Sequence, residues 1–252
     1  LACWYDRLPD SLTQTVVPTL VRRLPVSESK ISFEFKARRF ADHALLEPGR
    51  RHYAWKAFFD DALKQRLLQP DLLVALDGAL DGYPPFRCHY EAASRFDALT
   101  RFQYADTKVY LPDNNLTKVD RTSMAHSLEV RVPLLDERVA EFAFRLPTGL
   151  RMPGLRLKHF LRQSVGDLLP PEVRTRPKGG FNVPMSHWLK HDLRPLVEHY
   201  LSAEVIRRQG YFRPQVVARL VDEHMSGRAD QSRQLWALVM AGLWVEQAGM
   251  AR

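Results

Sequence analysis

Apolar residues recur at helical spacing along most of the chain, and no stretch alternates apolar and polar residues for long. Helices are predicted over residues 11–24, 31–46, 53–68, 90–109, 115–127, 137–146, 155–168, 187–201, 214–221 and 232–248. The last of these is apolar nearly all round, which is typical of a buried core helix. The strand candidates, Val109–Leu111 and Val130–Val132, are both short, so the pattern predicts an overwhelmingly helical fold.

Several helix boundaries are marked by residues with a known preference for them. Pro18 interrupts the first helical pattern and should divide it into two short helices. Asp136 is a good N-cap for the helix that follows, Ser186 is expected to cap the helix at 187–201, and Pro214 suits a first helical turn.

The stretch 69–89 is less regular. It contains the turn dipeptides Asp77-Gly78 and Asp81-Gly82, followed by Pro84-Pro85, which we expect to be extended. We interpret it as an internal hinge or insert within a unit that spans 1–252.

Composition narrows the class of protein only a little. A chain of 252 residues with a net charge of +8 fits one domain or two small ones and favours anionic partners. Its two cysteines predict no disulfide framework and fit a reducing cytoplasm. The histidines form no ligand pattern with Cys or Glu, so we expect no metal site, and the longest apolar run (235–245) is too short for a bilayer. The chain does not begin with Met, which suggests a piece of something longer.

Positive charge gathers before a Pro/Gly-rich loop, RTRPKGGF (174–181). From Arg151 to Lys178 there are seven Lys/Arg against two acids. Lys178 is the candidate cation for phosphate oxygens and a leaving pyrophosphate, with Arg174 and Arg176 shaping the same field. A solvated basic turn is the structural alternative, and chemistry alone slightly favours it.

A second polar segment, LPDNNLTKVDR (111–121), offers groups of both signs. Asp113 could orient an amine or accept its proton, although a turn and helix cap is the favoured alternative. Asp120 and Arg121 could reach a ligand or each other. Downstream, apolar residues flank Glu129 and Arg131, which predicts a buried ion pair.

Two long motifs carry a resemblance to a known family. The run LPDNNLTKVDRTSMAHSLEVRVPLLDERVAEFAFRLP (111–147) resembles a signature of the glutamine-hydrolysing asparagine synthetase family. Residues 157–190 resemble the family's next signature, and RQLWALVMAGLW (233–244) resembles its last helix. The resemblance implies the mainly α, helix-rich C-terminal portion of an adenine-nucleotide alpha-hydrolase-like (PP-loop) α/β synthetase domain, with the parallel sheet largely absent.

The resemblance also implies an activity and its residues. ATP, with Mg²⁺ held by residues outside this chain, would activate aspartate as an acyl-adenylate. Ammonia from glutamine would then displace AMP and give asparagine. Lys178 and Asp113 would be catalytic, and Arg176, Lys178, Asp120 and Arg121 would bind the nucleotide. Aspartate itself is not fixed, because relatives modify sugars or close lactam rings.

The departures from the family pattern set further expectations. The S-G-G-x-D-S nucleotide loop and the glutaminase domain are absent, so both should lie upstream and the chain alone should be inactive. A missing sheet would leave an apolar face open, which predicts a partner chain or a homodimer. The alternative function is a basic helical binding module without catalysis, perhaps contacting nucleic acid, and its support is the charge.

Overall fold

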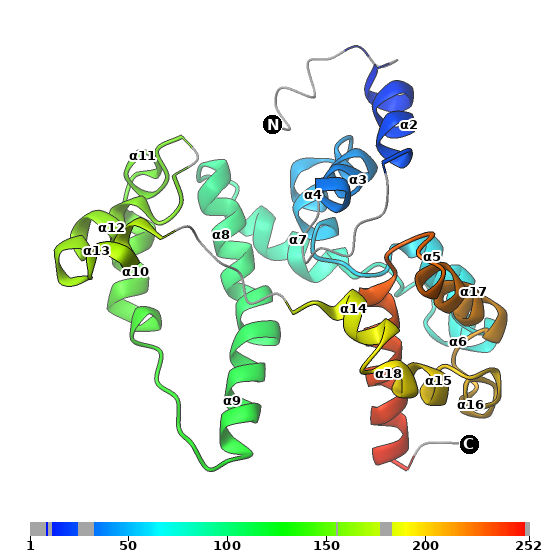
Figure 1. The fold of residues 1–252 in the computed structure, drawn as a ribbon. Helices are drawn as coiled ribbons and strands as arrows, with labels where there is room; N and C mark the ends of the chain where they lie inside the picture. Colours follow the sequence, from blue (N-terminus) through cyan, green and yellow to red (C-terminus); the bar gives the residue numbers. More distant parts are fainter. Residues whose placement is uncertain (1–8, 10–11, 25–32, 155, 177–182, 250–252) are drawn as a thin grey trace. The chain divides into compact units, whose positions relative to one another are not determined.

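The computed structural model describes residues 9, 12–24, 33–154, 156–176 and 183–249, and within these ranges the chain is helical (Figure 1). No strand forms among these residues, and Leu68 and Phe212 make an isolated antiparallel bridge. The expected mainly α fold is therefore confirmed. The strand candidate Val109–Leu111 is wrong, because Val109 ends one helix and Leu111 begins the next. None of the described helices is both long and apolar enough to cross a membrane.

The chain divides into two units, 1–82 with 181–252 (unit 1) and 83–180 (unit 2). The division at Gly82 falls inside the stretch 69–89, where a hinge remains a prediction. The described helical elements of unit 1 are η1 (Leu12–Val16), α2 (Val17–Arg22), α3 (Phe33–His43), α4 (Pro48–Ala54), α5 (Asp61–Leu67), α6 (Pro70–Ala75), α14 (Met185–Lys190), α15 (Arg194–Tyr200), α16 (Ala203–Gln209), α17 (Pro214–Met225) and α18 (Ser232–Gln247).

The core of unit 1 forms around α18, against which α14, α15 and α17 pack. Leu235, Leu238 and Val239 of α18 are buried, as predicted for this helix, although Met240 and Trp244 on its other side are exposed. The fully buried core side chains include Leu189, Val197, Ile206, Val217 and Leu235.

The N-terminal segment also reaches this core, because Leu67 is buried in it and Phe59 and Leu63 pack against it. Leu67, at the end of α5, is buried among side chains from α14 to α18. Its carbonyl accepts a hydrogen bond from the Arg213 amide (2.7 Å), and the Gln69 amide donates to the Tyr211 carbonyl (3.0 Å). Unit 1 is thus built from two parts of the chain that are far apart in sequence.

Unit 2 is also helical. Its elements are α7 (Tyr83–Ala92), α8 (Ala98–Lys108), the π-helical turn η2 (Leu111–Leu116), α9 (Thr117–Met124), the 3₁₀ turn η3 (Pro133–Leu135), α10 (Glu137–Arg145), α11 (Thr148–Arg151), α12 (His159–Ser164), the 3₁₀ turn η4 (Gly166–Leu168) and α13 (Pro171–Thr175). α7 packs on α8, where the ring centres of Tyr90 and Phe102 lie 5.3 Å apart. Within α7, the ring centres of Tyr90 and Phe86 lie 6.2 Å apart.

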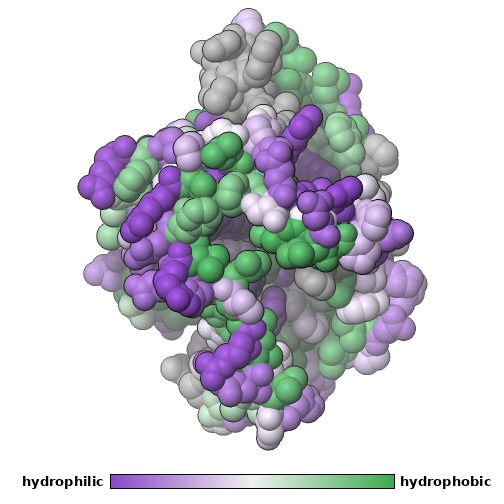
Figure 2. Space-filling model, turned by 90° about the vertical axis from the view of Figure 1, so that its left-hand side faces the viewer, coloured by the Kyte–Doolittle hydropathy of each residue, from purple (hydrophilic) through white to green (hydrophobic). Residues whose placement is uncertain are grey.

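The rest of unit 2 leaves many large apolar side chains on its surface. Figure 2 views the molecule from the side on which Figure 1 draws α10, α12 and α13, and apolar residues lie there between charged ones. Among the described residues from 119 to 173, the exposed large apolar ones are Val119, Met124, Leu128, Val130, Val132, Leu134, Leu135, Val139, Phe142, Leu150, Leu157, Leu161, Leu168, Leu169 and Val173. A soluble monomer seldom exposes so many large apolar residues in one stretch, so this part of unit 2 is suited to a partner.

Some predicted boundaries are confirmed by the structure. The Asp136 carboxylate caps α10 by accepting a hydrogen bond from the Arg138 amide (3.0 Å). Pro214 occupies the first turn of α17, where a missing amide proton costs nothing. Pro18 also lies in the first turn of α2, directly after η1, so the predicted pair of short helices is present.

Other boundaries differ from the prediction for local reasons. The helix expected over 53–68 is two helices, because the Asp60 carboxylate accepts from the Leu63 amide and starts α5 anew. Ser186 lies inside α14 rather than at its cap. Pro84-Pro85 is helical rather than extended, since both prolines lie in the first turn of α7.

Candidate functional site

The polar segment 111–121 follows α8 in unit 2, and contacts with other residues anchor the first turn of α8. Asp97 caps α8, and its carboxylate accepts hydrogen bonds from the Thr100 amide (3.1 Å) and hydroxyl (2.7 Å). Arg151 approaches this cap from α11, donating to the Thr100 hydroxyl and lying 3.6 Å from an Asp97 oxygen. The start of α8 is therefore anchored to another element.

These contacts lower the pKa of the Asp97 carboxyl group. The hydroxyl hydrogen bond from Thr100, with smaller contributions from the Thr100 amide, Thr148 and Arg151, lowers the pKa of Asp97 to about 2. Each of these groups stabilises the charged carboxylate, whereas burial raises the pKa and offsets part of their effect. Asp97 is thus a structural acid whose charge supports the helix leading to the candidate site.

Asp113 lies within a helical turn rather than at a helix start. η2 follows Tyr110 and runs directly into α9, and no side-chain cap occurs at the beginning of either. The Asp113 amide donates to the Val109 carbonyl (3.2 Å), while its exposed carboxylate makes no hydrogen bond or ion pair with another described residue. The interpretation of Asp113 as a helix cap is therefore wrong, and its carboxylate is accessible for chemistry.

Asp120 and Arg121 lie on the same continuous helix as Asp113. Asp120 comes seven positions after Asp113, which is about two turns and roughly 10 Å along the axis. The side chains of Asp120 and Arg121 are both exposed, and neither forms an ion pair with the other or with any other described residue. The helix thus presents two carboxylates and a guanidinium that have no structural partner in the described part of the chain.

The basic segment is described up to Arg176. The Arg176 amide ends α13 by donating to the Glu172 carbonyl (3.1 Å), and its side chain is exposed. Arg174 instead lies 3.4 Å from an Asp167 oxygen. Lys178 lies outside the described residues, and no described hydrogen bond or ion pair joins Arg176 to Asp113, Asp120 or Arg121.

The prediction that Glu129 and Arg131 form a buried ion pair is wrong about burial. The two side chains form an ion pair at 2.5 Å, but they are 69% and 83% exposed rather than buried. The apolar flanks of this segment, including Leu128 and Val130, are exposed as well. Apolar neighbours predicted burial, and unit 2 alone does not supply a surface that would cover them.

A metal does not fit the described residues. Within the described ranges, no group of three or more His, Cys, Asp or Glu side chains could hold an ion. Asp113 and Asp120 are too far apart along their helix to share one ligand sphere with each other. No step is therefore assigned to Mg²⁺ in this chain.

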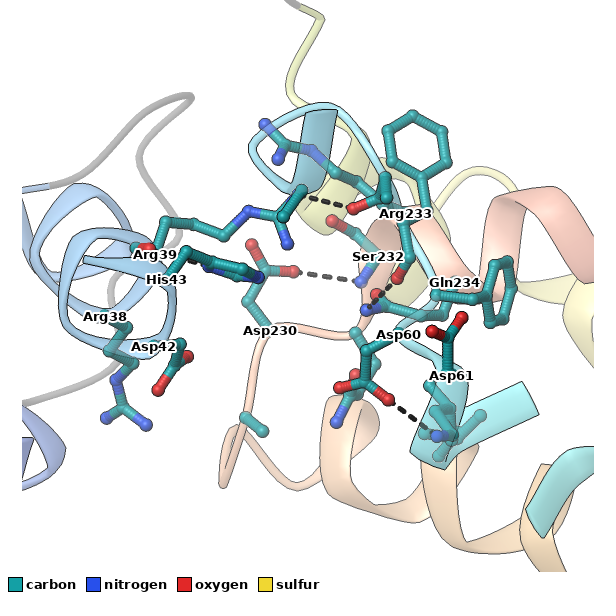
Figure 3. Close-up of a pocket in the computed structure, with 18 of the residues that line it drawn as sticks. Arg38, Arg39, Asp42, His43, Asp60, Asp61, Asp230, Ser232, Arg233 and Gln234 are labelled. Carbon is teal, nitrogen blue, oxygen red and sulfur yellow. Dashed lines mark hydrogen bonds between the residues drawn. The ribbon is translucent and has the colours of Figure 1, made fainter. Parts of the chain in front are cut away.

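Sequence reasoning missed a charged cavity in unit 1, lined by α3, residues 57–61 and residues 229–234. No periodicity in the sequence indicated it, because its charged side chains come from segments far apart along the chain, such as Arg39, Asp60 and Asp230 (Figure 3).

Comparison with known proteins identifies relatives. The family model described as asparagine synthase matches residues 7–246. The chain is 30% identical over 158 residues to glutamine-hydrolysing asparagine synthetase 1 of Bacillus subtilis, covering 63% of this chain and 25% of that protein.

Two further relatives give the same picture. A putative glutamine-hydrolysing asparagine synthetase of Mycobacterium bovis is 36% identical over 156 residues, covering 62% of this chain and 24% of that protein. The glutamine-hydrolysing asparagine synthetase of Mus musculus is 35% identical over 150 residues, 51% of this chain and 25% of that protein. The chain thus spans about a quarter of the length of these relatives. No solved structure matches it significantly.

Proposed function

The chain belongs to the asparagine synthase family, and from this premise we propose that it supplies part of the active site of an ATP-dependent amide-forming ligase. In the proposed reaction an aspartate side-chain carboxylate attacks the α-phosphorus of ATP, and pyrophosphate leaves. Ammonia derived from glutamine then attacks the acyl carbon and AMP leaves, which gives asparagine.

The observation that carries this proposal is the set of exposed, unpartnered charges on the helix from 111 to 124. Some charged side chains elsewhere in unit 2 are paired with a neighbour, as Arg145 is with Glu141 (2.9 Å) and Arg138 with Asp136 (3.1 Å). Asp113, Asp120 and Arg121 have no such described partner, although they lie in the family's longest motif. Groups kept accessible in this way are suited to a ligand that carries both charge and hydrogen-bond donors.

Each residue has a proposed role. Asp113 orients the attacking amine or accepts its proton. Asp120 and Arg121 bind the nucleotide together with Arg176, and Lys178 neutralises the charge that develops on the leaving pyrophosphate. The PP-loop architecture and its parallel sheet are proposed to be supplied by the rest of the synthetase domain.

The apolar surface of unit 2 supports the proposal that the chain works with further protein. Val139 and Phe142 follow one another at helical spacing on α10, yet they are 40% and 52% exposed. An amphipathic helix ordinarily buries such a stripe. We propose that the nucleotide-binding portion of the domain covers it, and that the 252-residue chain alone is inactive.

Aspartate-dependent exchange of labelled pyrophosphate into ATP tests both parts of the proposal. We expect no exchange with the chain alone and exchange when it is joined to a nucleotide-loop portion of the domain. Exchange by the chain alone would contradict the incomplete site. Absence of exchange in the joined protein, with aspartate and with other carboxylate substrates, would contradict the ligase.

A further inference from the structure

The segment between α9 and α10 presents an apolar face that the described part of the chain leaves open. Residues 128–132 form neither helix nor strand, and they belong to the connection that Figure 1 draws between these two helices. Leu128, Val130 and Val132 are 61%, 45% and 43% exposed. They occupy every second position, which is the spacing that places side chains on one face of an extended chain.

The two charged residues of this segment lie on the other face. Glu129 and Arg131 alternate with the apolar residues, and their side chains meet at 2.5 Å. Side chains two positions apart point to the same side of an extended backbone. The sequence L-E-V-R-V (128–132) therefore has the pattern of a strand with one apolar and one charged face.

The backbone of the segment lacks the hydrogen bonds of a strand. From 129 to 131, the amides and carbonyls form no hydrogen bond with another described residue. At the ends, the Leu128 amide donates to the Ser123 carbonyl (3.0 Å), and the Val132 carbonyl accepts from the Leu135 amide (2.9 Å). An extended backbone with free polar groups is suited to pairing with another strand.

The order of the side chains is complementary to itself in an antiparallel arrangement. When two copies pair with Val130 opposite the partner's Val130, each Glu129 lies opposite the partner's Arg131. Each Leu128 then lies opposite the partner's Val132, so the two apolar faces coincide. Opposed residues of opposite charge and opposed β-branched residues both stabilise an antiparallel pair.

The free backbone groups select the same register. In an antiparallel pair, residues that exchange both backbone hydrogen bonds alternate with residues that exchange none. If Glu129 and the partner's Arg131 are the hydrogen-bonded pair, the contact uses only backbone groups that are free from 129 to 131. The amide of Leu128 and the carbonyl of Val132 then keep their present partners, because these residues fall in pairs without backbone hydrogen bonds.

We propose that residues 128–132 are a homodimer contact, in which two copies of the chain pair as antiparallel strands about a two-fold axis at Val130. A two-fold axis brings the same patch of both copies together, which the self-complementary order of this segment permits. The ion pair within each chain is exchanged for two ion pairs between the chains. No substrate or catalytic step is involved, so the inference does not rest on the proposed function.

Charge reversal tests this register. In sedimentation equilibrium over about 5–500 μM and at low salt, the purified 252-residue chain should show a monomer–dimer equilibrium. Glu129→Arg places arginine opposite arginine in both charged pairs, and Arg131→Glu places glutamate opposite glutamate. Each variant should therefore dimerise about 10-fold or more weakly than the wild type. Both positions are exposed, so the stability of the fold should change little.

A mixture of the two variants is the most specific measurement. In a mixed dimer every opposed charged pair joins an arginine to a glutamate, so the two variants should bind each other about 10-fold more tightly than each binds itself. The double variant Glu129→Arg/Arg131→Glu should dimerise as the wild type does, for the same reason. Apolar association elsewhere in the chain would not give this pattern, because all these variants have the same apolar surface.

Glu198→Arg is the matched control. Glu198 is an exposed acid of α15 in unit 1, and one of its oxygens lies 2.7 Å from Nε of Arg194. Its reversal changes the net charge as Glu129→Arg does and likewise breaks an exposed ion pair, but it lies outside the segment. Dimerisation should be unchanged, and circular dichroism would establish that each variant is folded.

Two results would overturn the proposal. One is a wild-type chain that stays monomeric up to about 500 μM, which would leave the segment to a strand of a different protein. The other is a dimer in which the folded single variants associate as strongly as the wild type, or in which their mixture associates no more tightly than each variant alone.

Discussion

At the scale of single residues, we expect the charged side chains without a described partner to matter more for activity than those in ion pairs. Exposed ion pairs such as Arg145 with Glu141 contribute little to stability, about 0–1 kcal/mol. Asp113, Asp120 and Arg121 have no described partner, so replacing them should change activity and leave folding intact. That separation is what distinguishes a functional group from a structural one.

Lys178→Ala gives the most direct residue-scale prediction for catalysis. In the chain joined to a nucleotide-loop portion of the domain, we expect pyrophosphate exchange to fall about 100-fold or more, because the cation proposed to stabilise the leaving pyrophosphate is removed. Lys178→Arg should retain part of the rate. The measurement is labelled pyrophosphate exchange at saturating ATP, and an unchanged rate in Lys178→Ala would assign the loop to solvated surface.

Asp97 gives a prediction about pH. Its folded pKa is about 2, below its ordinary value of 3.8, so its charge stabilises the folded state above pH 3.8 and this contribution is lost as the pH falls towards 2. Asp97→Asn should therefore be less stable than the wild type at neutral pH, and the difference should shrink from pH 4 to pH 2. Urea unfolding at each pH measures this difference.

The cause of the lowered pKa of Asp97 can be tested separately. Thr100→Val removes the hydroxyl that contributes most to it, so the pKa of Asp97 should rise towards its ordinary value. An NMR titration of the Asp97 carboxyl carbon would report it. A folded wild type in which this carboxyl titrates at its ordinary value would contradict the assignment.

At the scale of elements, the sequence was most informative where one residue decides a boundary. Asp136 and Pro214 mark helix starts through their own side chains, and both were predicted. The break before α5 was missed because Trp55 and Phe59 continue a helical pattern while the Asp60 cap interrupts it. The partners of Arg39 could not be predicted either, since they are carbonyls 16 and 18 residues away.

Leu235 provides the element-scale prediction. Its side chain is fully buried in the core of unit 1, so Leu235→Ala should lower the free energy of unfolding by about 2–5 kcal/mol through lost burial and a cavity. Met240→Ala is the control, because Met240 lies on the same helix and is 45% exposed. Thermal and urea denaturation measure both, and equal costs would show that α18 is not the centre of the core.

At the scale of the whole molecule, the sequence predicted a helical chain with an open apolar face. The helical content is confirmed, and the exposed side chains of unit 2 agree with an uncovered surface. The division into two units was not predicted, because it depends on Leu67 meeting residues more than 100 positions later. Periodicity describes each helix and contains no information on such distant pairs.

The apolar face leads to a prediction about association. The chain alone should self-associate in sedimentation velocity as its concentration rises, since exposed apolar area favours contact. Val139→Asp should reduce this association while changing the free energy of unfolding by only about 0.5 kcal/mol, because Val139 is exposed. Val74→Asp, at an exposed valine of unit 1, is the matched control and should leave association unchanged.

The return of the chain to unit 1 has a consequence for biosynthesis. As the polypeptide emerges from the ribosome, Leu67 appears long before the helices that enclose it, and the hydrogen bonds of Leu67 and Gln69 require residues 211 and 213. The side chain of Leu67 therefore stays exposed to solvent until most of the helices from α14 to α18 have been translated. Chaperone dependence should consequently be greatest for nascent chains that end between these two segments.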